Sequence, residues 1–228
     1  MCQSHSPEIV FLCETKNQPH LVESKLRSCD FMNWRIVSPT GTAGGLALAW
    51  KEGTTVEILA EKEFFIAAKV TDHALNCSWG LIGVHLNSLD GIRSTQYTEL
   101  SSFVQGSFGK VIIMGDFNAI VSLDEKEGGG RGLKSVSSIS EFVNFIDGGG
   151  LKDLGMIGRR FTWTNRRRGQ DQIRERLDRA LANGEWMDYF PSASLSRLTK
   201  NGSDHVPILL DTNPVIENSN KRFKFQER

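Results

Sequence analysis

The chain has 228 residues, 39% of them hydrophobic, which is enough apolar material to fill one large core or two small ones. Lys plus Arg equals Asp plus Glu at 27 each, so a net charge of zero gives the molecule no overall attraction for a polyanion. No basic segment leads into an apolar core at the N-terminus, and no apolar run approaches the roughly 20 residues that cross a bilayer. We expect a single domain in the nucleus or the cytoplasm, neither secreted nor bound to a membrane.

The predicted elements are mostly short apolar strands, with a few amphipathic helices between them. A helix over 92–104 separates strands at 79–86 and 111–117, an order typical of a βαβ unit. After residue 211 the composition turns polar, which predicts a domain over 1–211 and a linker or tail over 212–228. The other strands are expected at 8–14, 34–37, 45–50, 56–59, 64–70, 161–164, 174–181, 194–198 and 206–210, and the other helices at 19–29 and 138–146.

The most informative stretch is Val-Ile-Ile-Met-Gly-Asp-Phe-Asn at 111–118. Its four apolar residues suit a strand that is buried on both faces, and Gly115 permits a tight turn of the backbone. Asp116 and Asn118 are offset by two, so in an extended backbone their side chains point to the same side. There the carboxylate can accept a proton or position a water molecule, while the amide donates to an oxygen. An Asx turn that closes the strand is the alternative.

Further polar residues follow other predicted buried strands, namely Glu14, His85, Asp178, and Asp204 with His205. Hard divalent cations such as Mg²⁺ take oxygen ligands, which Glu14 and Asp204 can supply. His85 and His205 can neutralise charge on a scissile phosphate or protonate a leaving oxygen, and Asp178 can orient one imidazole. Together these groups predict metal-assisted phosphodiester hydrolysis. For His85 alone, a buried imidazole satisfied by a backbone partner is the alternative.

One segment departs from the even charge balance. Residues 159–179 contain eight arginines against Asp171, Glu175 and Asp178. Arg166, Arg167 and Arg168 form the loop of a predicted hairpin between the strands at 161–164 and 174–181. The segment is either a solvated face or a surface that contacts phosphates.

Several motifs, in this order along the chain, resemble those of the endonuclease/exonuclease/phosphatase superfamily, which includes DNase I and the abasic-site endonucleases. Some segments look closest to the endonuclease domains of plant LINE-type non-LTR retrotransposons, and the likeness covers nearly the whole chain. The superfamily motifs are Glu14 in Phe-Leu-Cys-Glu-Thr-Lys, Gly115-Asp116-Phe117-Asn118, Arg176-Leu177-Asp178-Arg179 and Ser203-Asp204-His205. The retrotransposon-like segments are 43–50, 161–165, 175–181 and 222–225.

The resemblance implies an α/β (α+β) fold, a four-layer sandwich with two mixed β-sheets flanked by helices. It implies Mg²⁺ as cofactor, with Mn²⁺ as an alternative, and DNA as the partner of a monomer. A reverse-transcriptase domain, fused or lost, would accompany a domain of this kind.

The resemblance also implies residue roles. Glu14 looks like the metal-binding glutamate, with Asp204 beside the metal. Asp116 would orient or deprotonate the attacking water, and Asn118 would hold the phosphate. His205 would contact the scissile phosphate with support from Asp178, and His85 would act as an acid or an oxyanion donor. The residues assigned to the nucleic acid are Thr162, Arg166, Arg167, Arg168 and Ser203, the last mainly as a support for its loop.

Two differences from the family pattern stand out. Family members carry an Asn-bearing strand ahead of the glutamate motif, whereas only 13 residues precede Glu14 here. We therefore expect a domain truncated at its start, without that first strand and its metal-site amide. Retrotransposon and abasic-site members carry a Tyr where this chain has His85, so the local segment is more similar to the DNase I and phosphatase branches.

Three functions remain open at this point. The first is a metal-dependent endonuclease of retrotransposon origin that nicks DNA. The second is a catalytically dead remnant of such a domain, at most binding nucleic acid through residues 159–179. The third is a phosphatase of the same fold that acts on an inositol or sphingolipid head group. The arginine segment and the aromatic strand at 161–165 favour a nucleic acid over a lipid head group.

Overall fold

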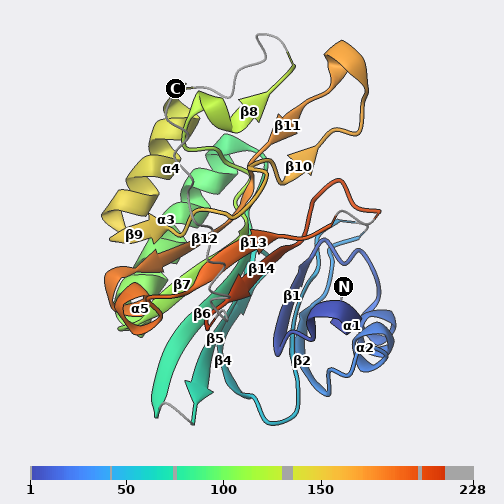
Figure 1. Ribbon diagram of the computed structural model, residues 1–228, viewed down its shortest axis with the longest axis vertical. Coiled ribbons are helices and arrows are strands. Elements are labelled where there is room, and N and C mark those ends of the chain that lie inside the picture. The colour runs from blue at the N-terminus through green and yellow to red at the C-terminus, as the bar shows by residue number, and fades with distance from the viewer. Residues whose placement is uncertain (1, 42, 74–75, 130–135, 200–201, 214–228) are drawn as a thin grey trace, which may run out of the picture.

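The computed structural model describes residues 2–41, 43–73, 76–129, 136–199 and 202–213. Its helices and strands form a mixed α/β arrangement with several sheets flanked by helices, which confirms the predicted fold class (Figure 1). The expected tail at 212–228 lies outside the described residues from 214 onward. Among the described helices, none is long and apolar enough to cross a membrane.

A six-stranded sheet forms the centre of the molecule. Its strands β6 and β7 are parallel and are joined by α3, which confirms the predicted βαβ unit. All other strand pairs of this sheet are antiparallel. The order is β4 (Thr55–Lys62), β5 (Phe65–Asp72), β6 (Cys77–His85), β7 (Val111–Asp116), β12 (Asp178–Asn183) and β9 (Leu151–Asp153).

Two long helices cover one face of this sheet, α3 (Asp90–Ser107) and α4 (Val136–Gly148) (Figure 1). Val84 and Ile113 of the sheet and Phe142 of α4 are fully buried between them. The helices form because apolar residues recur every three to four positions, so that one stripe of each meets the sheet. This packing supports β6 and β7 from behind.

The opposite face of the sheet carries a second layer of strands in two antiparallel pieces. One piece has the order β1 (Ile9–Cys13), β3 (Leu46–Trp50) and β2 (Asn33–Val37), and the other pairs β13 (Ser194–Arg197) with β14 (Ile208–Asp211). Helix α2 (Pro19–Arg27) packs on the outside of the first piece through Val22 and Leu26. The four layers are thus present. Within the described residues, however, the second layer is two antiparallel pieces and not one mixed sheet.

The prediction of one continuous strand over 174–181 is wrong, because this segment forms two separate strands. Its first part, β11 (Arg174–Glu175), pairs with β10 (Trp163–Thr164) and β8 (Lys126–Glu127), whereas its second part becomes β12. The two parts separate because the backbone N–H groups of Leu177 and Asp178 donate to the hydroxyl of Thr162 and not to a neighbouring strand. The remaining short elements are α1 (Cys2–His5), α5 (Gly184–Tyr189) and the 3₁₀ turns Leu123–Glu125 and Gly169–Asp171.

Candidate active site

Three of the predicted site residues form one row across the six-stranded sheet. His85 ends β6, Asp116 ends β7 and Asp178 begins β12, and the register pairs Asp116 with both of the others. Neighbouring strands lie about 4.8 Å apart, so paired residues present their side chains next to each other. Because β6 and β7 are parallel and β12 is antiparallel, two strand ends and one strand start meet at the same edge of the sheet.

Gly115 lets β7 approach β6 closely just before Asp116. Its φ angle is +138°, and a Cβ at this position would lie 2.1 Å from the carbonyl oxygen of Val84. A side chain here would collide with backbone that cannot move aside, because it belongs to a buried central strand. The glycine therefore sets the spacing of His85 and Asp116.

His205 joins this row from a loop. The N–H of Val206 donates to the carbonyl of Thr162 (2.7 Å), and Trp163 forms a bridge with His205. The Nδ1 atom of His205 lies 2.9 Å from Oδ2 of Asp178, and its Nε2 atom lies 3.7 Å from Oδ2 of Asp116. The loop thus aims both ring nitrogens at the two carboxylates.

Asp116 and Asp178 could hold one metal ion, and His205 lies beside them. Their ligand-type atoms lie within 4.8 Å of one another, and among the described residues no other group of three or more such side chains converges in this way. Asp116 is 2% exposed and Asp178 is 7% exposed, so both charges are withdrawn from solvent. Two buried carboxylates against one imidazole leave this group with an excess of negative charge.

The two histidines differ in charge. Burial alone would lower the pKa of His205, but the hydrogen bond and charge of Asp178, with Asp116 and Asp204, outweigh it and raise that pKa to about 9. For His85, burial dominates and lowers the pKa, although Glu14 and Asp178 act in the opposite direction. At neutral pH His205 is therefore an imidazolium and His85 is a neutral imidazole, whose Nε2 lies 3.7 Å from Asp116.

Asn118 is directed at protein groups. Its Nδ2 donates to the carbonyl of Leu86 (2.8 Å) and to Oδ2 of Asp116 (3.1 Å), and its backbone N–H donates to Oδ1 of Asp116 (2.8 Å). Both N–H bonds of the amide are directed at protein acceptors in this arrangement, and the donation from Asn118 to a phosphate stays a prediction. The Asx turn weighed as the alternative is present, and it fixes the carboxylate of Asp116.

The two predicted metal ligands lie at the margin of the site. Glu14 is exposed, with φ +52°, and its carboxylate pairs with Nζ of Lys16 at 3.0 Å. Asp204 is half-buried and accepts from Nε1 of Trp163 at 3.2 Å. Burial would raise the pKa of Asp204, but its backbone hydrogen bond, Trp163 and His205 together lower it. Neither residue belongs to the converging group of described side chains.

Two of the residues assigned to the nucleic acid act inside the protein. Thr162 is fully buried, and its hydroxyl accepts from the N–H groups of Leu177 and Asp178, both at 3.0 Å. In this structure Thr162 positions the start of β12, and its assignment to the nucleic acid stays a prediction. Ser203 accepts from the N–H of His205 at 3.1 Å, which agrees with its expected support of the loop.

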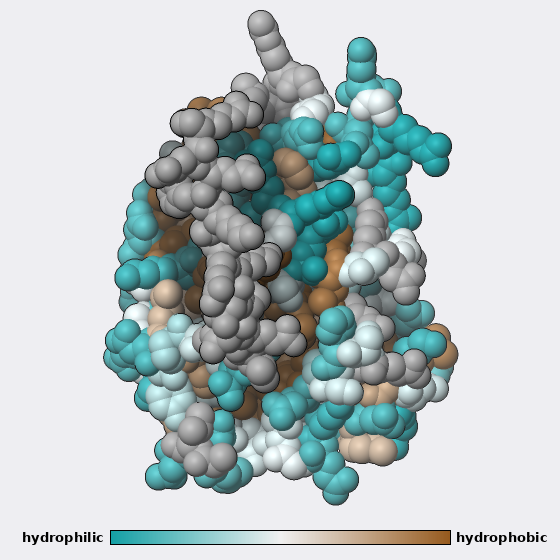
Figure 2. Space-filling view, viewed as in Figure 1, coloured by the Kyte–Doolittle hydropathy of each residue, from teal (hydrophilic) through white to brown (hydrophobic). Residues whose placement is uncertain are grey.

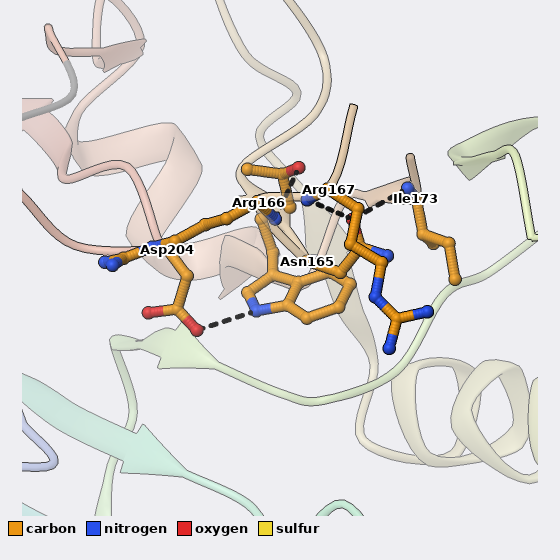
Figure 3. Close-up of a pocket in the computed structure, with 7 residues that line it drawn as sticks. Asn165, Arg166, Arg167, Ile173 and Asp204 are labelled. Atoms are coloured by element: carbon orange, nitrogen blue, oxygen red, sulfur yellow. Dashed lines mark hydrogen bonds between the residues drawn. The ribbon is translucent and has the colours of Figure 1, made fainter. Parts of the chain in front are cut away.

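The arginine loop borders an open hollow beside Asp204 (Figure 3). The hollow has a volume of about 430 Å³ and is lined by Trp163, Thr164, Asn165, Arg166, Arg167, Ile173 and Asp204. Arg166, Arg167 and Arg168 are exposed, and the guanidinium of Arg166 donates to the carbonyl of Gly202. Because Trp163 donates to Asp204, this hollow is continuous with the loop that carries His205.

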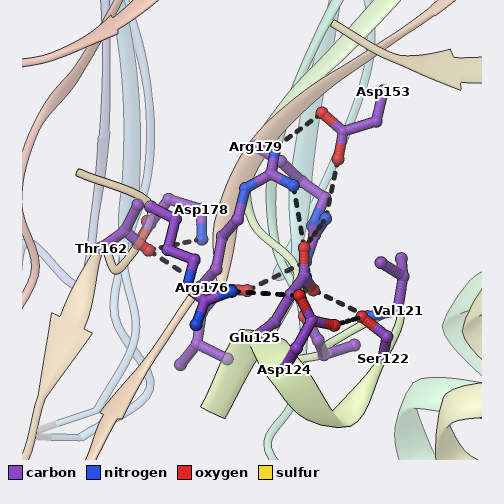
Figure 4. A network of polar contacts seen from close by, with 12 residues as sticks. Val121, Ser122, Asp124, Glu125, Asp153, Thr162, Arg176, Asp178 and Arg179 are labelled. Atoms are coloured by element: carbon purple, nitrogen blue, oxygen red, sulfur yellow. Dashed lines mark hydrogen bonds and ion pairs between the residues drawn. The ribbon is translucent and has the colours of Figure 1, made fainter. Parts of the chain in front are cut away.

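A buried ion-pair network, which the sequence patterns did not predict, supports the same strand (Figure 4). Arg179 is fully buried and pairs with Glu125 (2.6 Å) and Asp153 (2.7 Å), and Arg176 pairs with the same two carboxylates (2.8 and 2.7 Å). The signal in the sequence was Arg179 inside the predicted strand 174–181, since a buried guanidinium must find acids. The two arginines are thus removed from the basic surface that residues 159–179 were expected to form.

Comparisons with known proteins agree with this fold. No curated protein sequence matches the chain. A Neisseria 3′ phosphatase, NExo, bound to a product DNA hairpin superposes with a TM-score of 0.69 at 19% identity, covering 92% of this chain and 90% of that one. An AP endonuclease from Archaeoglobus fulgidus superposes with a TM-score of 0.70 at 15% identity, covering 92% of this chain and 90% of that one. The endonuclease domain of TRAS1, a telomere-specific non-LTR retrotransposon, superposes with a TM-score of 0.66 at 13% identity, covering 92% of this chain and 87% of that one.

These identities establish the common fold and nothing about the substrate. Membership is decided by the sequence, since the model of the Endonuclease/Exonuclease/phosphatase family matches residues 1–205. That match includes His85, Asp116, Asp178 and His205. The chain therefore belongs to the endonuclease/exonuclease/phosphatase family.

Proposed function

We propose that the chain is a Mg²⁺-dependent DNA endonuclease that hydrolyses phosphodiester bonds and nicks its substrate. The observation that carries this proposal is the convergence of Asp116, Asp178 and His205 at one sheet edge. Membership of a family of nucleases and phosphatases supports the reaction class. The neighbouring hollow and arginine loop support a nucleic acid as the substrate.

The residues present fit a hard divalent cation. Asp116 and Asp178 offer buried carboxylate oxygens that one imidazolium only partly neutralises. Glu14 and Asp204 add oxygen donors at the margin, and Mg²⁺ commonly takes one or two carboxylates with water and phosphate. Mn²⁺ accepts the same ligands. When bound, such a cation would supply neutralisation of phosphate charge and stabilisation of the leaving oxygen.

The protein's own groups can each take a part in hydrolysis. The imidazolium of His205, held by Asp178, lies where it can donate to a non-bridging phosphate oxygen. Asp116, held by Asn118, can accept the proton of a water molecule whose oxygen forms the new bond to phosphorus. The bond from phosphorus to the sugar oxygen then breaks, and that oxygen takes a proton from solvent. Neutral His85 can hydrogen-bond in the same space without adding charge.

The arginine loop supports DNA as the substrate. Arg166, Arg167 and Arg168 are exposed beside the hollow that leads to Asp204, so a strand crossing the site can place phosphates against them. Phosphate contacts position a nucleic acid and carry no base information, so this loop argues for DNA binding and not for a target sequence. An origin in a non-LTR retrotransposon is supported by the sequence segments 43–50, 161–165 and 175–181, which resemble endonuclease domains of such elements.

Nicking of supercoiled plasmid tests this function. We expect relaxed circles with Mg²⁺, none with EDTA, and a loss of about 10³-fold in rate for Asp116→Ala. Asp124→Ala is the matched control, because that carboxylate is largely exposed and pairs with Arg160 away from the site. Equal activity of the wild type and the Asp116 variant, or activity that survives EDTA, would refute the proposal.

A DNA-binding module without catalysis is the second candidate. It is favoured by Glu14, which pairs with exposed Lys16 and stands outside the converging group. In that case a folded protein would bind plasmid in a gel-shift assay and leave it supercoiled. Replacing Arg167 and Arg168 with Ala would then weaken binding. It would also make the plot of log binding constant against log salt concentration less steep, by about one unit of slope for each phosphate that the protein no longer neutralises.

A further inference from the structure

The loop that carries His205 lies along the hairpin of β10 and β11 in register. Trp163 of β10 forms an antiparallel bridge with His205. One residue further out on both segments, the N–H of Thr164 donates to the carbonyl of Asp204 at 3.2 Å. Each step forward along β10 is thus matched by one step backward along the loop, as in an antiparallel pair of strands.

Arg166 continues this row of contacts on its outer side. The guanidinium of Arg166 donates to the carbonyl of Gly202, and these two residues lie two positions beyond the pair of Thr164 and Asp204. Among the described residues, the row therefore ends on a hydrogen bond that a side chain makes to the backbone of the loop.

The backbone of Arg166 adopts an uncommon conformation at this point. Its φ angle is +59°, in the left-handed region that L side chains rarely adopt, and its N–H donates to the hydroxyl of Thr164 at 3.4 Å. Figure 3 shows the side chain of Arg166 running toward the loop of Asp204, whereas that of Arg167 points the other way. The turn thus separates the directions of two consecutive arginines.

The two neighbouring arginines have no such contact. The hairpin of β10 and β11 stands out from the body of the molecule, and Figure 2 shows hydrophilic residues over its outer part (Figure 1). Within the part of the chain that the structure describes, the guanidinium groups of Arg167 and Arg168 have no hydrogen-bond or ion-pair partner. They are available to phosphates, whereas the guanidinium of Arg166 is committed to the protein.

We propose that Arg166 is a positioning residue, which fastens the loop 202–205 to the hairpin and so keeps His205 beside the two buried carboxylates. Arg166 acts through the carbonyl of Gly202 and does not touch the substrate. Its contact closes the exposed end of the row, where local opening starts. Any force that a bound nucleic acid exerts on the hairpin therefore also acts on the loop of His205. The effect on catalysis rests on the proposed function, but the effect on the loop does not.

Three variants separate this role from a general effect of charge or backbone. Arg166→Asn removes the guanidinium with little strain, because Asn tolerates the left-handed region and is too short to reach Gly202. Arg166→Lys keeps a charged donor on a long side chain and should restore most of the wild-type behaviour. Arg167→Ala is the matched comparison, since it removes the same charge from the same hairpin without breaking the contact with the loop.

Hydrogen exchange of the Thr164 amide measures the opening of the row without any reaction. This N–H is bonded to the carbonyl of Asp204, so it exchanges when the loop leaves the hairpin. We expect it to exchange about tenfold faster in Arg166→Asn, the effect of losing one charge-assisted hydrogen bond, and at nearly the wild-type rate in Arg166→Lys and Arg167→Ala. Equal exchange in the wild type and in Arg166→Asn would overturn the proposal.

Steady-state nicking of supercoiled plasmid separates positioning from binding. Arg166→Asn should lower kcat about tenfold and leave KM almost unchanged, because His205 is displaced while the phosphate contacts remain. Arg167→Ala should instead raise KM and leave kcat almost unchanged. A raised KM with an unchanged kcat in Arg166→Asn would make Arg166 a phosphate contact and overturn the proposal. If the wild type does not nick, the proposed function fails by itself, and the exchange experiment still decides the role of Arg166.

Discussion

Two clusters of buried charge lie within a few residues of each other on β12, and they are built differently. In the network of Glu125, Asp153, Arg176 and Arg179, each guanidinium pairs with both carboxylates, so two positive charges meet two negative ones. In the site, Asp116 and Asp178 meet the single imidazolium of His205. The first cluster is neutral and closed, and the second keeps an excess of negative charge.

The difference indicates which cluster is structural and which is functional. A buried charge is tolerated when partners satisfy it, and the network satisfies its charges within the protein. The site satisfies only part of its charge internally, which leaves it able to attract a cation and, through that cation, a phosphate. The residues needed to stabilise β12 and the residues needed for chemistry are therefore neighbours in sequence but separable by mutation.

The largest expected effect is on stability and comes from breaking the neutral cluster. Arg179→Leu leaves Glu125 and Asp153 buried with one partner fewer and should lower the free energy of unfolding by about 4 kcal/mol. Urea denaturation measures it. The double variant Arg179→Leu/Glu125→Leu should recover part of the loss, because it removes the orphaned charge. No recovery would mean that packing of the arginine against Phe142, and not charge balance, is what matters.

Asp178→Asn should instead affect activity. It keeps the shape of the side chain but removes the charge that holds His205 as an imidazolium, so plasmid nicking should fall about 10²-fold. Near-UV circular dichroism should remain that of the wild type. Asp171→Asn is the control, because Asp171 is an exposed carboxylate on the arginine hairpin. An unchanged nicking rate in Asp178→Asn would remove His205 from the mechanism.

The raised pKa of His205 predicts a pH-dependent term in stability. Its folded pKa of about 9 lies above the unfolded value of 6.5, so its stabilising contribution is complete below pH 6.5 and is lost as pH rises through 9. We expect the unfolding free energy of the wild type to exceed that of His205→Gln by about 3 kcal/mol more at pH 6 than at pH 10. Urea denaturation of both proteins across that range tests this. A constant difference would show that His205 is not charged at neutral pH.

The smallest expected effect is the stabilisation that a cation gives when it binds to the excess negative charge of the site. Mg²⁺ at ten times its dissociation constant should stabilise the wild type by about 1.4 kcal/mol, seen as a rise in Tm. Asp116→Asn and Asp178→Asn should lose this rise. Glu14→Gln should reduce it only if that marginal carboxylate reaches the cation. A rise of equal size in all of these variants would place cation binding elsewhere on the protein.

Sequence patterns located the strands of the site well, because apolar runs and glycine are local signals. The row of His85, Asp116 and Asp178 follows from strands whose existence was predicted, but its register depends on pairing that no local pattern contains. The structure places Asp116 between His85 and Asp178 in this row, and its catalytic role stays a prediction. Asn118 and Thr162 make hydrogen bonds to protein groups that no local pattern predicted.

The contacts that the sequence did not predict have one physical origin. A hydroxyl or an amide can serve either a ligand or the backbone, and only the three-dimensional arrangement decides which. Thr162 is occupied by two backbone N–H groups, and Asn118 is occupied by Leu86 and Asp116. The fold likewise decides the partners of Arg176 and Arg179, because the carboxylates with which they pair, those of Glu125 and Asp153, lie far away in the chain. Partners at that separation cannot be predicted from a single sequence.

The order in which the site residues occur along the chain has a consequence for biosynthesis. His85 and Asp116 are made early, but His205 is held in place by the Val206–Thr162 and Trp163–His205 contacts. While the ribosome is still translating, an emerging chain that ends before Val206 lacks the Val206–Thr162 contact that holds His205 beside the carboxylates. Under the proposed nuclease function, such a nascent polypeptide would leave the nucleic acids around it intact until almost the whole domain has been released and folded.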